Sequence, residues 1–415
     1  MKITITKDGH SYLLPFLRVT SLFFLWGFAH AILEVLNPHL KELLGLSHAN
    51  AAWVQVATYG AYFLMAIPAG KIIRRWGYRG GVLTGLVLYG IGALLFLPIC
   101  FFGVGFNNPL VIFVAFIGAL FVIGCGLTCL ETSANPYVTV LGDKNSAEQR
   151  INFAQSLNGL GWVCGPLIGG LFFFDEKPQT SAPDIFSVAL PYLIVGIVVL
   201  FSAIAFSRCD LPEVDEQNAE KKARNNDAVK SNLWKNKIFV LGVVALFLYV
   251  AAQTGVNSNF VAYMKENAGI APNEASKWLA FGGMGLFFVM RIVGSWVMGF
   301  VKAERLLLLF AIGATIGSLV VVMFGNWLSM VAFFLIFLCE SIMFPTIFAL
   351  ALRGAEGETK RASSYLVMTI VGGAVAPYLM GLVADNSTIA LAFVVPMVCY
   401  IFIAVYASLF TKNNG

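Results

Sequence analysis

The chain has 415 residues, of which 59% are hydrophobic and only 12% are charged. A soluble domain carries about 25% charged residues, so this composition excludes a water-exposed surface and predicts a protein embedded in a bilayer. The net charge of +5 does not indicate a nucleic-acid-binding protein, because the basic residues gather at the ends of apolar stretches. In a membrane protein such residues orient the chain.

Long unbroken apolar stretches follow one another along the whole sequence. A helix needs about 20 apolar residues to cross a bilayer, whereas a β-strand needs only about ten in an alternating pattern. The sequence therefore predicts an all-α membrane protein with twelve transmembrane helices in two six-helix bundles. The spans are expected at residues 13–40, 50–73, 79–102, 108–140, 148–174, 187–207, 237–264, 275–300, 305–324, 327–352, 360–384 and 388–410.

A polar segment separates the sixth expected span from the seventh. Residues 208–236 change abruptly from aliphatic to mixed charge, a composition that cannot bury a core. We interpret them as a cytoplasmic linker between an N-terminal bundle, residues 1–207, and a C-terminal bundle, residues 237–415. Most basic loop residues lie on the side of this linker, and the positive-inside rule then places both termini in the cytoplasm.

The two halves repeat one another. Glu131 precedes Pro136 by the same spacing as Glu340 precedes Pro345, and both pairs lie inside apolar runs. A second match, with one constant offset, relates the fifth span to the eleventh through Arg150, Gly161, Pro166 and Gly170 against Arg361, Gly372, Pro377 and Gly381. Two repeats of the same sense joined by a polar linker are typical of the major facilitator superfamily, in which the central site lies between the halves.

Three carboxylates lie deep within the expected spans, namely Glu34, Glu131 and Glu340. An ionisable group at membrane depth costs roughly 2.5–3.5 kcal/mol even on lenient insertion scales, so a functional role is the default interpretation. Burial disfavours the charged form, and such a carboxyl can therefore take up and release a proton. The alternative is a protonated glutamate bonded to a neighbouring helix, and Glu340 could also be a relic of the duplication.

Two basic side chains are also embedded. His30 precedes Glu34 by four residues, which places both on one helical face. It could tune proton binding or contact substrate hydroxyls, or it could simply bond to a backbone carbonyl. Arg291 lies nearer the cytoplasmic end of the eighth span. We expect it to reach the lipid headgroups rather than pair with a cavity carboxylate.

Amides and aromatic rings provide the rest of a candidate substrate site. Gln155 and Asn158 share a helical face in the fifth span, and Gln253 and Asn257 lie in the seventh. The glycine and asparagines of the seventh span also suggest an interrupted helix. Amides bind hydroxyl groups, and rings can cover the C–H face of a sugar. The aromatic candidates are Trp26, Phe28, Tyr137 and Phe344.

The sequence contains no motif that is typical of an enzyme active site. Its seven cysteines and four histidines show no metal-binding spacing, and no nucleophile–base motif is present. We therefore expect a transporter that needs no cofactor and no metal.

Several runs of residues resemble the fucose–proton symporter family: Phe23–Ala29 (FFLWGFA), Gly124–Gly142 (GCGLTCLETSANPYVTVLG), Phe344–Phe348 (FPTIF) and Val367–Gly373 (VMTIVGG). The resemblance covers nearly the whole chain. It implies a bacterial inner-membrane importer of hexoses or 6-deoxyhexoses driven by protons. It also implies that Glu131 is the protonation site, that Glu34 contributes to sugar binding and coupling, and that Gln155 and Asn158 bind sugar.

The chain departs from the resembled symporter at His30, Glu34, Phe344 and Glu340, so these residues are candidates for setting specificity. Fucose, galactose, glucose and N-acetylglucosamine all remain possible substrates. A sodium-coupled sugar symporter, a drug–proton antiporter and a non-transporting sugar sensor are the alternatives. The expected partners are a sugar, protons and the lipid bilayer, with the monomer as the working unit.

Overall fold

The structure is a computed structural model that describes residues 6–7, 10–43, 53–103, 109–173, 186–208, 233–325, 327–355 and 358–413. Side chains at 33–43 are not part of that description, so the side chain of Glu34 lies outside the described residues although its backbone belongs to a helix. Most of the predicted linker, residues 209–232, is likewise outside them.

The first half consists of long helices. They are α1 (Leu13–Leu43), α3 (Trp53–Leu94), α4 (Phe96–Gly103), α5 (Pro109–Val140), α6 (Ala147–Phe173) and α7 (Phe186–Ser207), with a short 3₁₀ turn η1 (Lys144–Ser146) before α6. A hairpin of two-residue strands, β1 (Thr6–Lys7) and β2 (His10–Ser11), precedes them. Helix α3 contains two crossings, because Gly77 takes a φ of 72° in the left-handed region, which glycine adopts without steric cost.

The second half is more broken. It contains η2 (Leu233–Lys235), α9 (Lys237–Ala268), α10 (Pro272–Lys277), η3 (Trp278–Met284), α11 (Gly285–Val297), α12 (Ala303–Met323), α13 (Trp327–Glu340), α14 (Met343–Arg353), α15 (Thr359–Met368), η4 (Thr369–Val371), α16 (Gly372–Asn386), α17 (Ile389–Ala392) and α18 (Val394–Asn413). Of these, η3 is a π-helical turn and η4 is a 3₁₀ turn.

The predicted twelve crossings are confirmed. Within the described ranges, ten stretches are long and apolar enough to cross a membrane. One of them, Val56–Phe102, contains two crossings on either side of the Gly77 kink, and α6 adds another. Within the residues that the structure describes, strands occur in the short hairpin before α1 alone, and the fold is all-α as predicted.

The predicted interruption of the seventh span is wrong. Helix α9 is continuous from Lys237 to Ala268, and the amide of Asn259 bonds to the carbonyl of Gly255 within the same helix. The interruption lies in the tenth span instead, where α13 ends at Glu340 and α14 begins at Met343. Pro345 lies in the first turn of α14, where its missing N–H needs no partner within the helix.

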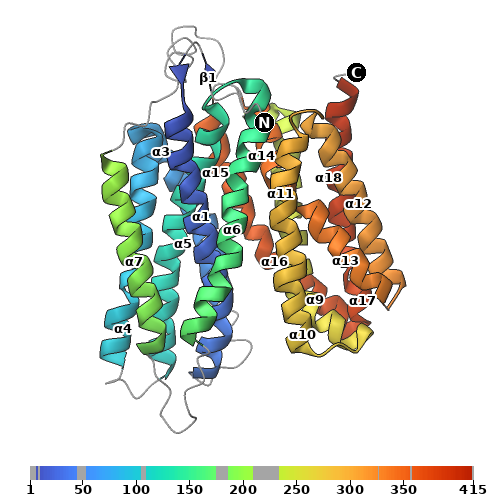
Figure 1. Cartoon of the computed structure of the whole chain (residues 1–415), viewed down its shortest axis with the longest axis horizontal. Helices are drawn as coiled ribbons and strands as arrows, with labels where there is room; N and C mark the ends of the chain where they lie inside the picture. Colours follow the sequence, from blue (N-terminus) through green and yellow to red (C-terminus); the bar gives the residue numbers. More distant parts are fainter. Residues whose placement is uncertain are drawn as a thin grey trace.

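The helices form two groups that meet along one interface (Figure 1). In the first half α3 packs on α5 and α7, and α1 packs on α6; in the second, α12 packs on α13 and α18, and α9 packs on α16. Across the interface α11 and α14 contact α6, and α15 contacts α3 and α5. Strand β1 and the end of α18 lie at the same end of the molecule, which we call the terminal end.

Candidate functional site

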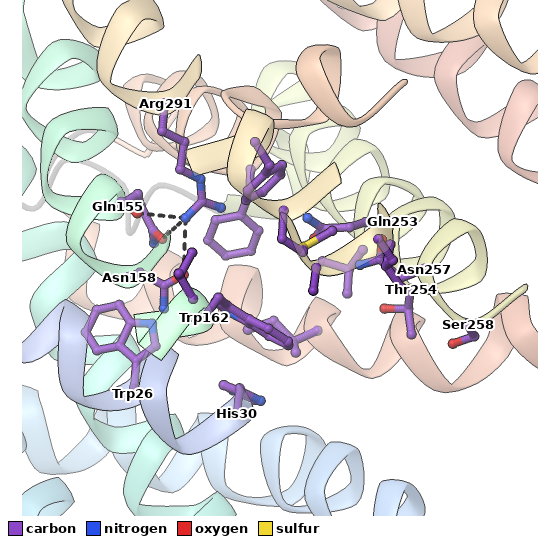
Figure 2. Close-up of a pocket in the computed structure, with 18 of the residues that line it drawn as sticks. Trp26, His30, Gln155, Asn158, Trp162, Gln253, Thr254, Asn257, Ser258 and Arg291 are labelled. Atoms are coloured by element: carbon purple, nitrogen blue, oxygen red, sulfur yellow. Dashed lines mark hydrogen bonds between the residues drawn. The ribbon is translucent and has the colours of Figure 1, made fainter. Parts of the chain in front are cut away.

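A cavity of about 570 Å³ lies between the two halves. Both halves supply its walls, and Figure 2 shows the side chains of α1 and α6 facing those of α9 and α11 across it. The lining residues that matter for chemistry are Trp26, His30, Glu131, Gln155, Asn158, Trp162, Gln253, Asn257, Arg291 and Phe344. The cavity thus contains seven of the nine predicted site residues.

Glu131 lies at the cavity wall in a chain of three polar side chains. Its side chain comes from α5 and is only 5% exposed. The hydroxyl of Tyr62, from α3, donates to Glu131 Oε1 at 2.5 Å, and His30 Nε2, from α1, lies 2.9 Å from that hydroxyl. His30 Nε2 is 3.9 Å from Glu131 Oε1. Because the Tyr62 hydroxyl donates its hydrogen to Glu131, the Tyr62 oxygen can accept a hydrogen bond from the N–H of His30 Nε2.

Aromatic rings fix the position of His30 and cover the cavity wall. The His30 ring is parallel to that of Trp162, with an interplanar angle of 7° and centroids 6.1 Å apart. Trp26 packs against Phe23 with centroids at 4.1 Å. Tyr137 does not reach the cavity, because it packs on Tyr78 within the first half.

The predicted amide pair is present at the interface. Gln155 and Asn158 face the cavity from α6, and both are at least nine-tenths buried. Gln155 donates to Asn135 Oδ1 at 3.3 Å, and Asn158 donates to the carbonyl of Phe23 at 3.4 Å. Their acceptor oxygens are bound by Arg291, as Figure 2 shows.

The expectation for Arg291 is wrong. It is 4% exposed, lines the cavity and lies over the ring of Phe287 at 4.4 Å, so it does not reach the lipid headgroups. The position of Arg291 near the end of its span suggested that it reaches the lipid headgroups. The helix instead turns this side chain toward the other half of the protein. A guanidinium with five donors can satisfy several buried oxygens at once, which compensates for its desolvation.

The seventh span contributes amides to the opposite wall. Gln253 and Asn257 line the cavity from α9 together with Thr254 and Ser258 (Figure 2). The side-chain oxygen of Asn257 is buried and has no hydrogen-bond partner in the described part of the chain. It is therefore available to a hydroxyl donor.

Glu340 does not line the cavity, although its repeat partner Glu131 does. Its side chain is fully buried in the second half, where the hydroxyl of Tyr400 donates to Oε1 and Oε2 has no partner among the described residues. The hydroxyl of Tyr249 donates to the Glu340 carbonyl at 2.9 Å. This placement argues against direct substrate binding by Glu340, whereas Phe344, one turn later, does reach the cavity.

Polar contacts close the cavity at its terminal end. Arg353 of α14 forms an ion pair with Glu148 of α6, with Nε–Oε1 at 2.8 Å. Three further hydrogen bonds join the halves there: Asn152 to Thr346, Ser295 to the Gln149 carbonyl and Ser363 to the Thr132 carbonyl. The opposite end includes exposed lining residues, Ser276 and Lys277. The cavity therefore opens away from the terminal end.

Sequence reasoning missed Tyr62, Trp162 and the inward orientation of Arg291. Tyrosine and tryptophan are common in membrane spans, and nothing in the local sequence distinguishes Tyr62 from its neighbours. Only the packing of α3 against α5 places its hydroxyl on Glu131.

The sequence profile of the Major Facilitator Superfamily matches residues 19–370. The chain is 33% identical over 413 residues to a glucose/galactose transporter of Brucella abortus, an alignment that covers 99% of this chain and 97% of that one. It is 32% identical to the L-fucose-proton symporter of Escherichia coli, over 96% of this chain and 94% of that protein.

Solved structures give the same picture. The Major Facilitator Superfamily transporter FucP in the outward conformation matches with a TM-score of 0.86 at 32% identity, over 96% of this chain and 99% of that chain. A partially occluded inward-open structure of the xylose transporter XylE from Escherichia coli is 14% identical and matches with a TM-score of 0.65, which shows the shared fold alone.

Proposed function

Because the chain belongs to the Major Facilitator Superfamily, to the family that holds the fucose–proton symporter, we propose that it is a proton-coupled sugar importer. Its relatives and structural neighbours are transporters, and the chain is a multi-pass membrane transporter rather than an enzyme. One observation carries the proposal. A carboxylate bonded to a tyrosine opens onto the same cavity as four amides and several aromatic rings.

The lining chemistry supports a sugar as substrate. Gln155, Asn158, Gln253 and Asn257 present amide donors and acceptors from both walls, and Phe344 adds an apolar face. A hexose has hydroxyls around its rim and C–H groups on its faces, and such mixed cavities match it well. The relatives named glucose/galactose transporter and L-fucose-proton symporter support a hexose or 6-deoxyhexose, with N-acetylglucosamine as a further candidate.

We assign the coupling proton to Glu131, with Glu34 as the second coupling acid. Glu131 is nearly buried yet opens onto the cavity, so it can exchange a proton with cavity water. His30 and Tyr62 form a hydrogen-bonded route from the cavity to its carboxylate. Once protonated, Glu131 is neutral, and the bundles can then rock and close the cavity around it without enclosing an unpaired charge.

Transport then follows from rocking of two bundles, residues 1–207 and 237–415, around the central cavity. We place the terminal end in the cytoplasm of a bacterial cell, with the protein in the inner membrane. The present structure is then outward-facing, which its likeness to FucP in the outward conformation supports. One charge moving through about 100 mV is worth about 2.3 kcal/mol, enough to sustain roughly a 40-fold sugar gradient.

The test uses the purified chain in proteoliposomes. A panel of unlabelled hexoses and 6-deoxyhexoses competes against a radiolabelled sugar, and the external pH is followed while each sugar is added. Alkalinisation that depends on the sugar supports the proposal. Uptake that requires sodium and moves no protons would overturn the coupling assignment. Resistance to lipophilic cations without sugar uptake would favour a drug–proton antiporter.

A further inference from the structure

The guanidinium of Arg291 ties the two halves together at the floor of the cavity. Its Nη1 donates to the Gln155 carbonyl at 2.7 Å, to Gln155 Oε1 at 3.2 Å and to Asn158 Oδ1 at 3.1 Å. Arg291 belongs to α11 in the second half, and both amides belong to α6 in the first. These are the bonds drawn between the two walls in Figure 2.

The other side of the same guanidinium holds the break in the tenth span. Arg291 Nε donates to the Ser341 carbonyl at 2.9 Å, and the Tyr249 hydroxyl donates to the Glu340 carbonyl. Both carbonyls lie where α13 ends, so they lack the partners that a continuous helix would give them. In a membrane interior an unpaired carbonyl is costly, and these donors therefore stabilise the break.

A ligand can replace the bonds that Arg291 makes to the side chains of Gln155 and Asn158. Nη1 has two hydrogens but three acceptors, so its bonds are shared. The two side-chain contacts are also longer than the contact to the backbone. No described carboxylate forms an ion pair with Arg291, and only neutral oxygens hold the charge on this side.

We propose that Arg291 is a positioning residue that works as a substrate-operated latch between the halves. In the outward-facing structure it joins the α6 amides to the break between α13 and α14. Sugar hydroxyls that donate to Gln155 Oε1 and Asn158 Oδ1 take over these acceptors, which leaves Arg291 bonded to α6 only through the Gln155 carbonyl and weakens the tie between the halves. This inference rests on the proposed sugar site and adds the link between sugar binding and rocking of the bundles.

The experiment compares R291Q and R291K with the parent protein in proteoliposomes. A cysteine replaces Ser363, which is fully buried at the terminal end and bonds across the halves to Thr132. Its labelling by a membrane-permeant maleimide reports opening of that end, and the protein without the added cysteine gives the background. Sugar affinity is measured in parallel by radioligand binding.

We expect R291Q to raise the labelling rate about tenfold without sugar, since it loses charge-assisted bonds across the interface. Sugar should then add little further labelling, while its affinity stays within about threefold of the parent or increases. R291K retains the charge, but its single nitrogen cannot bond at once to the Ser341 carbonyl and to the α6 amides. It should therefore show the same pattern as R291Q, and it tests the proposal even if R291Q does not fold.

Two results would overturn the latch. A tenfold loss of sugar affinity with unchanged labelling would make Arg291 a direct sugar ligand. Unchanged labelling and unchanged affinity would leave it a packing residue. Failure of the parent to bind any sugar would instead refute the proposed function, and the labelling rates without sugar would still test the tie between the halves.

Discussion

The ion pair between Glu148 and Arg353 should hold the terminal end closed. It joins α6 of the first half to α14 of the second, so it exists only while the halves meet there. Glu148 is 3% exposed, whereas the Arg353 side chain is 41% exposed. Changing Glu148 to Gln keeps the size of the side chain and removes its charge.

The size of the effect follows from this geometry. A buried hydrogen bond to a charged group contributes about 1.5–3 kcal/mol, and solvent at the exposed arginine reduces that value to about 1–2 kcal/mol. At 1.4 kcal/mol per factor of ten, the equilibrium should shift toward the inward-open state by roughly 5- to 30-fold. The maleimide-labelling rate of a cysteine at position 363 measures this shift.

Glu304→Gln is the matched control. Glu304 also faces Arg353, with Nη1–Oε2 at 3.8 Å, but it belongs to α12 in the same half. Its ion pair with Arg353 lies within the second half, so we expect its substitution to change labelling by less than about twofold. Equal effects of the two substitutions, or no effect of Glu148→Gln, would show that the Glu148–Arg353 ion pair does not hold the terminal end closed.

Three further substitutions test other parts of the site. Tyr62→Phe removes the donor to Glu131, a bond worth about 1.5–3 kcal/mol, and should lower uphill uptake at least tenfold while sugar counterflow persists. Glu340→Gln should keep uptake and sugar affinity within about twofold in flux and binding assays, because the side chain lies outside the cavity. Gly27→Ala places a Cβ in steric clash with the Asn158 carbonyl and should lower the thermal midpoint and weaken sugar binding.

Each of these has its own contrary outcome. Normal uphill uptake by the phenylalanine variant would remove Tyr62 from the coupling route. A tenfold loss of affinity in Glu340→Gln would return Glu340 to the substrate site. Gly60→Ala is the control for Gly27, since its added Cβ meets nothing within 4 Å, and equal destabilisation of both would refute the packing argument.

Composition, the length of the apolar stretches and the internal repeat were enough to predict the fold, because stretches of membrane-spanning length leave few alternatives. Glu131 and the Gln155–Asn158 pair could be found for the same reason, since polar groups at membrane depth need partners. The structure places all three at one cavity. Tyr62 could not be found, because its role depends on which face of α3 meets α5.

Arg291 and the seventh span show where local signals mislead. The position of an arginine along a helix does not tell whether its side chain faces lipid or protein. Arg291 faces protein, because it is buried between α6 and the break between α13 and α14. Glycine and asparagine suggested a break in α9, but every backbone group within a membrane helix can be satisfied inside that helix. The side-chain amide of Asn259 donates a hydrogen bond to the Gly255 carbonyl, and α9 continues to Ala268.

The repeat relates Glu131 to Glu340 by sequence, yet the structure gives them unequal surroundings. Glu131 meets the cavity beside Tyr62 and His30, whereas Glu340 is enclosed by Tyr400 and Tyr249. A duplicated position thus keeps its carboxyl in both halves while only one copy reaches the cavity. The coupling proposal accordingly rests on Glu131.

The most direct measurement compares uphill sugar uptake and sugar counterflow in Glu131→Gln proteoliposomes with those of the parent. Counterflow needs sugar binding and rocking but no net proton movement. We expect the variant to lose uphill uptake and sugar-dependent alkalinisation while counterflow continues. Loss of sugar binding and counterflow together, in a folded variant, would contradict it and make Glu131 a sugar ligand or a structural residue.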